Sequence, residues 1–174
     1  LFVVTLEGGL YCFAGEAAEP KRYARRAEPL PAGSARWSDQ AKQILETTGR
    51  KEGYCLLLGL GTGELLCRLL DQSQLHVVAL DLDAGKVEAI RRKLDDAGYY
   101  GTRAAVHVGD ITTMQLAPYM ADLIVSEDLD AAGLRQGDRF LERVFHSLRP
   151  YGGIACFAAP KARHAEILKR AAKL

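Results

Sequence analysis

The sequence predicts an α/β protein with a Rossmann-like, doubly wound parallel sheet flanked by helices and preceded by a short β-hairpin. Two observations support this prediction. Short apolar runs without polar alternation, which are typical of strands buried on both faces, recur along the chain. Between these runs lie segments in which apolar residues recur at helical spacing. Strands that alternate with helices in this way form a parallel sheet covered on both faces.

Five strands and five helices are expected in this alternation. The predicted strands are Tyr54–Leu58, His76–Leu80, Ala104–Val108, Leu123–Val125 and Ile154–Ala158. The predicted helices are Trp37–Thr48 behind the possible cap Ser38, Glu64–Asp71, Ala84–Ala97, a helix with the apolar face Leu141, Val144, Phe145 and Leu148, and Lys161–Lys173.

The N-terminal part has a different pattern. Phe2–Phe13 contains two β-rich runs separated by Glu7, Gly8 and Gly9, which predicts a hairpin. A hairpin alone is marginal in water, so it must pair with something. We therefore divide the chain into a hairpin (1–15), a Pro-containing basic linker (16–36) and an α/β domain (37–174). Because the first residue is Leu1 and lies within a strand, we expect a piece of a longer polypeptide.

Composition limits the possible functions. A chain of 174 residues, 48% of them hydrophobic, can form one good core. With 23 basic and 22 acidic side chains, no overall charge favours nucleic acid or an anionic membrane, and no apolar run approaches the roughly 20 residues that span a bilayer. The four cysteines lack metal-binding spacing, so we expect buried free thiols and no metal site.

Three glycines at every second position follow the first strand of the sheet. They are Gly59, Gly61 and Gly63, in the stretch LLLGLGTGELL. In such a sheet the ligand lies beyond the C-terminal ends of the strands, where the strand order reverses. Backbone N–H groups there can hold a polar ligand, and a Cβ at Gly59 or Gly61 would keep the ligand away. The alternative is a tight turn without a ligand, but a turn needs one glycine rather than three.

The spacing separates two classes of nucleotide cofactor. The dinucleotide fingerprint G-x-G-x-x-G would require glycine where this chain has Glu64, whose carboxylate would compete with a pyrophosphate for the same amides. A dehydrogenase is therefore the less favoured alternative. Asp81 stands about 20 residues after the glycines, where a carboxylate can accept both ribose hydroxyls. Asp83 is the better candidate for the cap of the next helix.

Taken together, these residues resemble the class I S-adenosylmethionine-dependent methyltransferases over Trp37 to Lys173. LLLGLGTG, VVALD, HVGDI, ADLIVSED and SLRPYGGIACF resemble five ordered motifs of that family, the last with Tyr151 inserted. The resemblance implies S-adenosylmethionine as cofactor, with Asp81 on the ribose, Asp110 on the adenine amino group and Ile111 packed on the ring. The cofactor site that it implies consists of Gly59, Leu60, Gly61, Thr62, Gly63, Asp81, Leu82, Gly109, Asp110 and Ile111.

Two departures from the family favour an alternative function. The acidic residue that usually stands two positions before the first glycine is Leu57 here. The sixth and seventh strands of the family sheet have no counterpart among the five expected strands. Both features are compatible with a catalytically silent methyltransferase-like fold that serves as a binding or docking module.

Catalytic candidates are expected after the fourth strand, at Ser126, Glu127 and Asp128. Methyl transfer requires an aligned nucleophile and, if that nucleophile is protonated, a base. The pair Ser126–Glu127 resembles the entry to the substrate loop of protein arginine methyltransferases, but Asp128 and Gln136 depart from that pattern. The acceptor therefore stays unidentified. A solvated acidic loop is the alternative for Glu127, Asp128 and Asp130.

The N-terminal hairpin has a resemblance of its own. VVTLEGGLYCFAG resembles the end of a blade in quinoprotein-type (PQQ-like) β-propeller repeats. It implies that β-propeller repeats in the same chain are partners of the methyltransferase-like domain. Propellers of this type are commonly exported, whereas S-adenosylmethionine is an intracellular cofactor. Between these two indications we expect a cytoplasmic protein.

Overall fold

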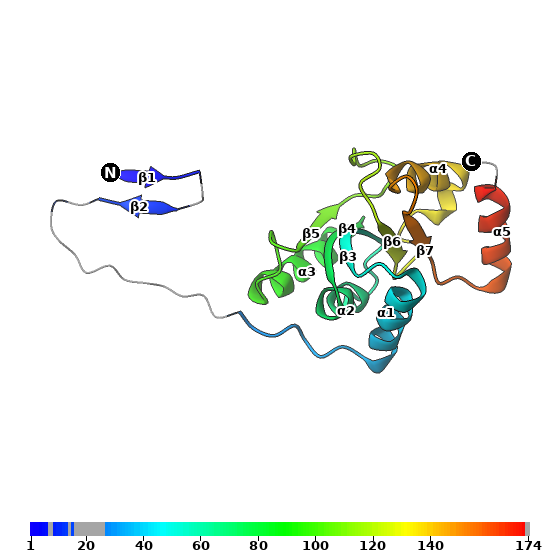
Figure 1. Cartoon of the computed structure of the whole chain (residues 1–174), viewed down its shortest axis with the longest axis horizontal. Helices are drawn as coiled ribbons and strands as arrows, with labels where there is room; N and C mark the ends of the chain where they lie inside the picture. The colour runs from blue at the N-terminus through cyan, green and yellow to red at the C-terminus, as the bar shows by residue number, and fades with distance from the viewer. Residues whose placement is uncertain (7–8, 14, 16–26, 173–174) are drawn as a thin grey trace.

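The computed structural model describes residues 1–6, 9–13, 15 and 27–172. Its centre is a five-stranded sheet in the order β5-β4-β3-β6-β7, in which every neighbouring pair is parallel (Figure 1). This confirms the predicted fold class. The strands are β3 (Glu52–Leu58), β4 (Gln74–Asp81), β5 (Ala104–Val108), β6 (Leu123–Ser126) and β7 (Ile154–Cys156).

Helices cover both faces of the sheet because successive residues of β3 are buried on opposite sides. Cys55 and Leu57 belong to a core cluster with residues of α1, α2 and α3, whereas Leu56 and Leu58 belong to a second cluster with residues of α4. All four side chains are fully or almost fully buried, which explains the absence of polar alternation. The helices are α1 (Ala35–Thr48), α2 (Glu64–Gln72), α3 (Ala84–Asp96), α4 (Asp138–Ser147) and α5 (Lys161–Ala171), with a short 3-10 helix η1 (Leu134–Gln136) before α4.

The start of α1 differs from the prediction. The helix begins at Ala35, so the last two residues assigned to the linker are helical, and Ser34 rather than Ser38 occupies the N-cap position. Ser38 lies inside the helix, where its Oγ accepts a hydrogen bond from Gln72 Nε2 at 3.0 Å. At the other end Gly49 stops the helix as expected, in a left-handed conformation with φ 66°.

The apolar face of α4 is also partly different. Leu141 and Val144 are buried as predicted, but Phe145 is 53% exposed and Phe140 is fully buried in its place. The reason is the helical period: a helix that begins at Asp138 and buries Leu141 and Val144 brings position 140 toward the core and turns position 145 away.

The N-terminal hairpin is present, as predicted. Strands β1 (Phe2–Val4) and β2 (Leu10–Cys12) pair antiparallel, with Phe2 opposite Cys12 and Val4 opposite Leu10. The predicted turn residues Glu7 and Gly8 lie outside the described residues. The described apolar side chains of the two strands are exposed, and so is Cys12, in contrast to the buried thiols expected from the sequence.

The topology fixes the place where a ligand can bind. From β3 the chain proceeds to β4 and β5 on one side and then returns to β6 and β7 on the other, so the strand order reverses between β3 and β6. The loops that follow β3 and β6 leave the sheet side by side at this point, which is where open α/β sheets bind ligands. Within the part of the chain that the structure describes, no helix is both long and apolar enough to cross a bilayer.

Candidate functional site

The three glycines of the loop after β3 all have left-handed backbones, with φ of 69°, 53° and 78° for Gly59, Gly61 and Gly63. A Cβ on Gly59 would collide with the Asp128 carbonyl oxygen, and one on Gly61 would lie 2.9 Å from Glu127 Cγ. The group that approaches these two glycines is therefore the protein's own loop after β6. If the glycine loop binds a ligand, it does so through its backbone amides, because the space that the absent side chains leave is filled by the protein itself.

Two backbone N–H groups, one in the glycine loop and one at the start of α2, donate hydrogen bonds to Glu127. Its Oε1 accepts hydrogen bonds from the Thr62 N–H at 2.6 Å and from the Thr62 hydroxyl, and its Oε2 accepts from the Leu65 N–H at 3.1 Å. Helix α2 begins here, and its N-cap residue Gly63 has no side chain that could cap it. Glu127 thus provides a carboxylate to the N-terminus of α2 from a distant part of the chain.

Glu64, by contrast, does not compete for these amides as the sequence suggested. Its Oε2 accepts hydrogen bonds from the backbone N–H and the hydroxyl of Ser34, at 2.7 and 2.8 Å. These bonds lower the pKa of Glu64 below its ordinary value. The carboxylate that accepts hydrogen bonds from the loop amides is that of Glu127. The competition for these amides that the sequence predicted from Glu64 therefore comes from the loop after β6.

Asp81 lies at the end of β4, next to the glycine loop. Its side chain is buried, with Oδ2 accepting from the Leu60 N–H at 2.7 Å and Oδ1 accepting from the Asp83 N–H at 2.8 Å. A carboxylate oxygen can accept two hydrogen bonds, so each oxygen retains one acceptor position. Asp83 caps α3 as predicted, accepting from the Gly85 and Lys86 N–H groups.

Asp110 follows β5 and is held by a polar network. Its Oδ1 accepts from the N–H and hydroxyl of Thr112, both at 2.7 Å, and its Oδ2 accepts from Gln136 Nε2 at 3.1 Å. Burial acts to raise the pKa of Asp110, but these hydrogen bonds outweigh it and hold the pKa below its ordinary value. Gln136, which the sequence analysis noted only as a departure from another family, is thus the partner that orients Asp110.

Two exposed apolar side chains lie beside the buried carboxylates. Leu82 is 57% exposed after β4, and Val108 is 46% exposed at the end of β5. Ile111, which is predicted to pack on an adenine ring, is 1% exposed and belongs to the core cluster that contains residues of α4. The neighbouring Gly109 donates its N–H to the Asp81 carbonyl oxygen at 2.9 Å, which keeps the ends of β4 and β5 together. The sequence predicted Val108 only as a strand residue, because nothing in the local pattern distinguishes this exposed valine from the other apolar residues of the strand.

The structure brings part of the predicted site together around one pocket. A pocket of about 340 Å³ is lined by Gly61 and Thr62 of the glycine loop and by Glu127 and Asp128 after β6. Asp128 Oδ1 accepts from the backbone N–H groups of Asp130 and Ala131, at 3.0 and 3.1 Å, which shapes this loop. The remaining lining residues are Trp37, Leu129, Asp130, Ala158, Pro160 and Arg163.

Ser126, the third predicted catalytic residue, is placed differently. It is 5% exposed, and its hydroxyl has no hydrogen-bond partner among the described residues. It lies at the edge of a separate pocket between α1 and β7 rather than in the one that Glu127 and Asp128 line. The structure therefore brings Glu127 and Asp128 together and leaves Ser126 apart from them.

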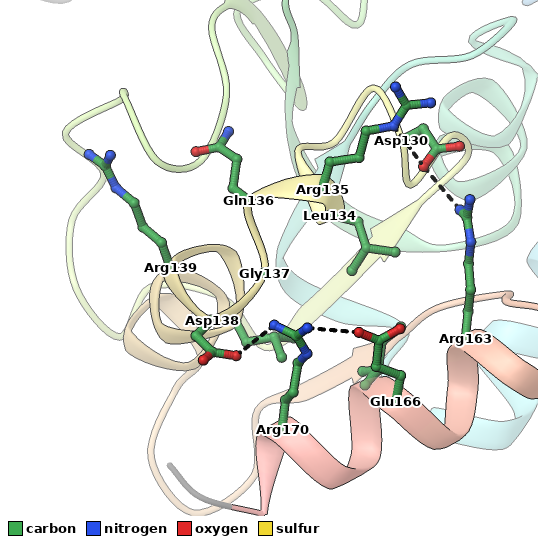
Figure 2. A pocket seen from close by; sticks show the side chains of 12 residues that line it. Asp130, Leu134, Arg135, Gln136, Gly137, Asp138, Arg139, Arg163, Glu166 and Arg170 are labelled. Atoms are coloured by element: carbon green, nitrogen blue, oxygen red, sulfur yellow. Dashed lines mark hydrogen bonds and ion pairs between the residues drawn. The ribbon is translucent and has the colours of Figure 1, made fainter.

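A larger cavity of about 590 Å³ lies between α5 and the segment formed by η1 and α4 (Figure 2). Most of its charged side chains are paired with one another. Arg163 contacts Asp130 at 3.0 Å, and Arg170 contacts Asp138 at 2.9 Å and Glu166 at 2.8 Å. None of the predicted site residues lines this cavity. Among the described residues no group of three or more His, Cys, Asp and Glu side chains could hold a metal ion.

Several solved structures share this architecture. An S-adenosyl-L-methionine-dependent methyltransferase from Methanococcus maripaludis is 22% identical, with a TM-score of 0.64 over 79% of this chain and 61% of its own. A phosphoethanolamine N-methyltransferase from Haemonchus contortus in complex with S-adenosyl-L-methionine is 18% identical, with a TM-score of 0.58 over 76% of this chain and 32% of its own. The [4+2]-cyclase SpnF is 16% identical, with a TM-score of 0.65 over 78% of this chain and 56% of its own.

These similarities establish the fold and no more, because every identity is low. The present chain also spans less than two thirds of each of these three structures. No curated protein matches the chain.

A match to a protein-family model gives more than the fold. The model described as "Methyltransferase domain" matches residues 55–152, which run from β3 past α4 and include the glycine loop, Asp81, Asp110 and Glu127. This match confirms the family predicted from the motifs and, with it, S-adenosylmethionine as the family's class of cofactor. Because the matched segment is more than half of the chain and contains the ends of β3, β4, β5 and β6, the chain belongs to the methyltransferase-domain family.

Proposed function

We propose that this domain binds S-adenosylmethionine at the C-terminal edge of its sheet and transfers the methyl group to an acceptor. One observation carries the proposal. The Leu60 N–H donates to Asp81 Oδ2 at 2.7 Å, which joins the loop after β3 to the carboxylate at the end of β4, beside the point where the strand order reverses. A nucleoside bound there would lie beside the glycine loop and meet the Asp81 carboxylate.

The residues present fit the nucleoside part of this cofactor. Asp81 would accept the ribose hydroxyls on the positions that Leu60 and Asp83 leave open. The exposed side chains of Leu82 and Val108 offer an apolar surface to the adenine ring. Asp110 Oδ2 accepts from Gln136 alone within the described residues, which leaves an acceptor position for the adenine amino group.

When bound, the cofactor supplies an electrophilic methyl group on a sulfonium. The residues of this chain then need to orient a nucleophile and receive its proton. Glu127 and Asp128 are the candidates because both line the pocket beside the glycine loop. Burial raises the pKa of Glu127, against the hydrogen bonds from Thr62 and Leu65, and a raised pKa suits a carboxylate that accepts a proton.

A catalytically silent binding or docking module is the second candidate, and two observations favour it. Leu57, at the position where the family usually has an acidic residue, is fully buried in the core. The loop amides are already hydrogen-bonded to Glu127. One similar structure is a cyclase, and a shared fold does not fix the reaction.

Ligand binding separates these candidates. Thermal melting with S-adenosylmethionine, S-adenosylhomocysteine and NAD should show a rise with the first two and none with NAD. A ligand at about 100 times its dissociation constant adds roughly 2.7 kcal/mol, which is about 5–10 °C for a chain of this size. No rise with either S-adenosyl compound would favour the silent module, and a rise with NAD would favour a dehydrogenase.

A pair of variants tests the site itself. Asp81→Ala should weaken S-adenosylhomocysteine binding by about 1.5–3 kcal/mol in calorimetric titration, because it removes the ribose contacts. Asp83→Ala is the matched control, since it removes a neighbouring carboxylate that only caps α3. The assignment of Asp81 fails if its replacement leaves the affinity unchanged, or if Asp83→Ala weakens binding equally.

The larger setting of the domain is also a proposal. The N-terminal hairpin, whose described apolar side chains are largely exposed, supports a partner for it, and its sequence resemblance suggests β-propeller repeats of the same chain. The domain division at residues 15 and 36, the unidentified acceptor and a cytoplasmic location belong with this proposal. The intracellular cofactor is the argument for the location.

A further inference from the structure

Resting on the proposed function, we infer that the pocket beside the glycine loop selects a ligand with a cationic end group over one with an anionic end group, and that Glu127 determines this selectivity. The inference concerns the end of the ligand that lies away from the nucleoside. It follows from the fact that a side chain of the protein already accepts the hydrogen bonds that the backbone N–H groups of this pocket can donate.

The N-terminus of a helix next to a glycine-rich loop is ordinarily a site for an anion, because its backbone N–H groups lack partners within the helix. In this protein the Thr62 and Leu65 N–H groups donate to Glu127, at 2.6 and 3.1 Å. The contact is built into the fold, because glycine at position 61 leaves the space that the Glu127 side chain fills. A ligand carboxylate would therefore meet another carboxylate instead of free amides.

The other charged groups of the pocket point to the same preference. Glu127 and Asp128 line it, and neither has a cationic partner among the described residues. The one guanidinium of the lining, Arg163, is paired with Asp130 at 3.0 Å. The pocket thus carries an excess of two carboxylates, which attract an ammonium or sulfonium and repel an acid.

This arrangement also bears on the departure at Leu57. Strand β3 provides the apolar, fully buried side chain of Leu57 where the family usually has a carboxylate for the methionine part of the cofactor. Glu127, which follows β6, brings a carboxylate to the glycine loop instead, and while it binds an ammonium the proton-accepting role proposed above falls to Asp128. Glu127 Oε1 already accepts from both the N–H and the hydroxyl of Thr62, but Oε2, which accepts from the Leu65 N–H, keeps one acceptor position, so the glutamate can bind an ammonium through Oε2 without leaving the loop.

Three nucleoside ligands with different end groups test the inference. S-adenosylhomocysteine has an ammonium and a carboxylate, its decarboxylated analogue has the ammonium alone, and 5′-methylthioadenosine has neither. Their dissociation constants are to be measured at pH 8 by calorimetry and by the fluorescence of Trp37, the single tryptophan, which lines the same pocket. We expect the decarboxylated analogue to bind about tenfold more tightly than S-adenosylhomocysteine.

The variant Glu127→Gln keeps the shape and removes the charge, and it should abolish this preference or reverse it. Glu142→Gln, at an exposed position of α4, is the matched control for loss of one negative charge and should leave the ratio unchanged. The inference is overturned if wild-type protein binds S-adenosylhomocysteine as well as the decarboxylated analogue, a comparison that needs no variant to fold. Binding of 5′-methylthioadenosine then shows that the nucleoside site of the proposed function survives, whereas a failure of all three ligands to bind refutes both proposals.

Discussion

At the scale of single residues, Gly61 and Gly49 have the same type of backbone in different surroundings. Both are left-handed, with φ of 53° and 66°, but a Cβ on Gly61 would lie 2.9 Å from Glu127 atoms whereas one on Gly49 would meet nothing within 4 Å. Alanine at either position costs the backbone strain of about 1–2 kcal/mol. Gly61→Ala should cost about 1–3 kcal/mol more in urea unfolding, because it also displaces a packed side chain.

A double variant isolates that second cost. In Gly61→Ala combined with Glu127→Ala, the steric part should disappear, so the two changes should be less destabilising together than the sum of the single changes. Equal destabilisation by Gly61→Ala and Gly49→Ala would mean that Glu127 does not fill the space beside the loop in solution.

Glu127 also makes stability depend on pH in a defined direction. Burial raises its pKa, although hydrogen bonds from Thr62 and Leu65 act against this, so the folded protein binds the Glu127 proton more tightly than the unfolded chain does. Its contribution is fully present below the unfolded value of about 4.3 and is lost as the pH rises through the folded pKa. Wild-type protein should therefore lose stability relative to Glu127→Gln over that range.

Urea unfolding of both proteins at a series of pH values measures the difference. Because the other carboxylates, including Asp110 with its lowered pKa, are common to both proteins, their contributions cancel in the comparison. A difference that changes in the opposite direction would show that the amide hydrogen bonds outweigh burial at Glu127.

At the scale of elements, α5 shows which kind of contact holds a helix in place. Arg170 forms ion pairs with Asp138 of α4 and Glu166 of α5, but these groups are exposed (Figure 2). Ile167 on the same helix packs against the core cluster that contains residues of α4. Exposed ion pairs contribute little, whereas a half-buried isoleucine contributes about 1–2 kcal/mol.

Ile167→Ala should therefore lower the melting temperature and speed hydrogen exchange of the α5 amides, whereas Arg170→Ala should leave both nearly unchanged. Melting curves at low and at 0.5 M salt provide the control, since screening should not affect the isoleucine contact. If Arg170→Ala is the more damaging change, and salt reproduces its effect, the ion pairs rather than the apolar contact hold α5.

Most elements could be predicted because their signals are local. The buried strands are mostly apolar runs, and Asp83 caps α3 through contacts two and three residues away. The prediction was wrong where a residue fits a local pattern but its contacts in the folded structure determine its role. Ser38 has the chemistry of a cap, yet its hydroxyl faces Gln72, and Phe145 has the spacing of a core residue, yet Phe140 takes the buried position.

At the scale of the whole molecule, the site could be predicted only as a set of strand ends. The motifs after β3, β4, β5 and β6 are read from the sequence, and the topology brings them to one edge of the sheet. Their partners cannot be read in this way, because Glu127 reaches Thr62 across 65 positions and Gln136 reaches Asp110 across 26. No local pattern indicates that a carboxylate after β6 takes the amides after β3.

The boundary of the domain can be tested by truncation, because part of the predicted linker packs on the domain. The Glu28 N–H donates to the Asp96 carbonyl oxygen at 2.9 Å, and Arg68 Nη2 donates to the Pro31 carbonyl oxygen at 2.6 Å. Between them, Leu30 packs against the core cluster formed with α1, α2 and α3. Residues 28–34 thus bind α2 and α3 before α1 begins.

A chain that starts at Ala27 should therefore melt at the same temperature as the full chain, whereas one that starts at Trp37 should melt lower. The second loses the half-buried Leu30 and the first two residues of α1, which together stabilise the domain by about 1–2 kcal/mol, or roughly 3–8 °C. Leu30→Ala in the full chain should reproduce part of that loss. Equal melting of both truncated chains would instead support the predicted boundary at residue 37, since the contacts of residues 28–34 would then contribute nothing to stability.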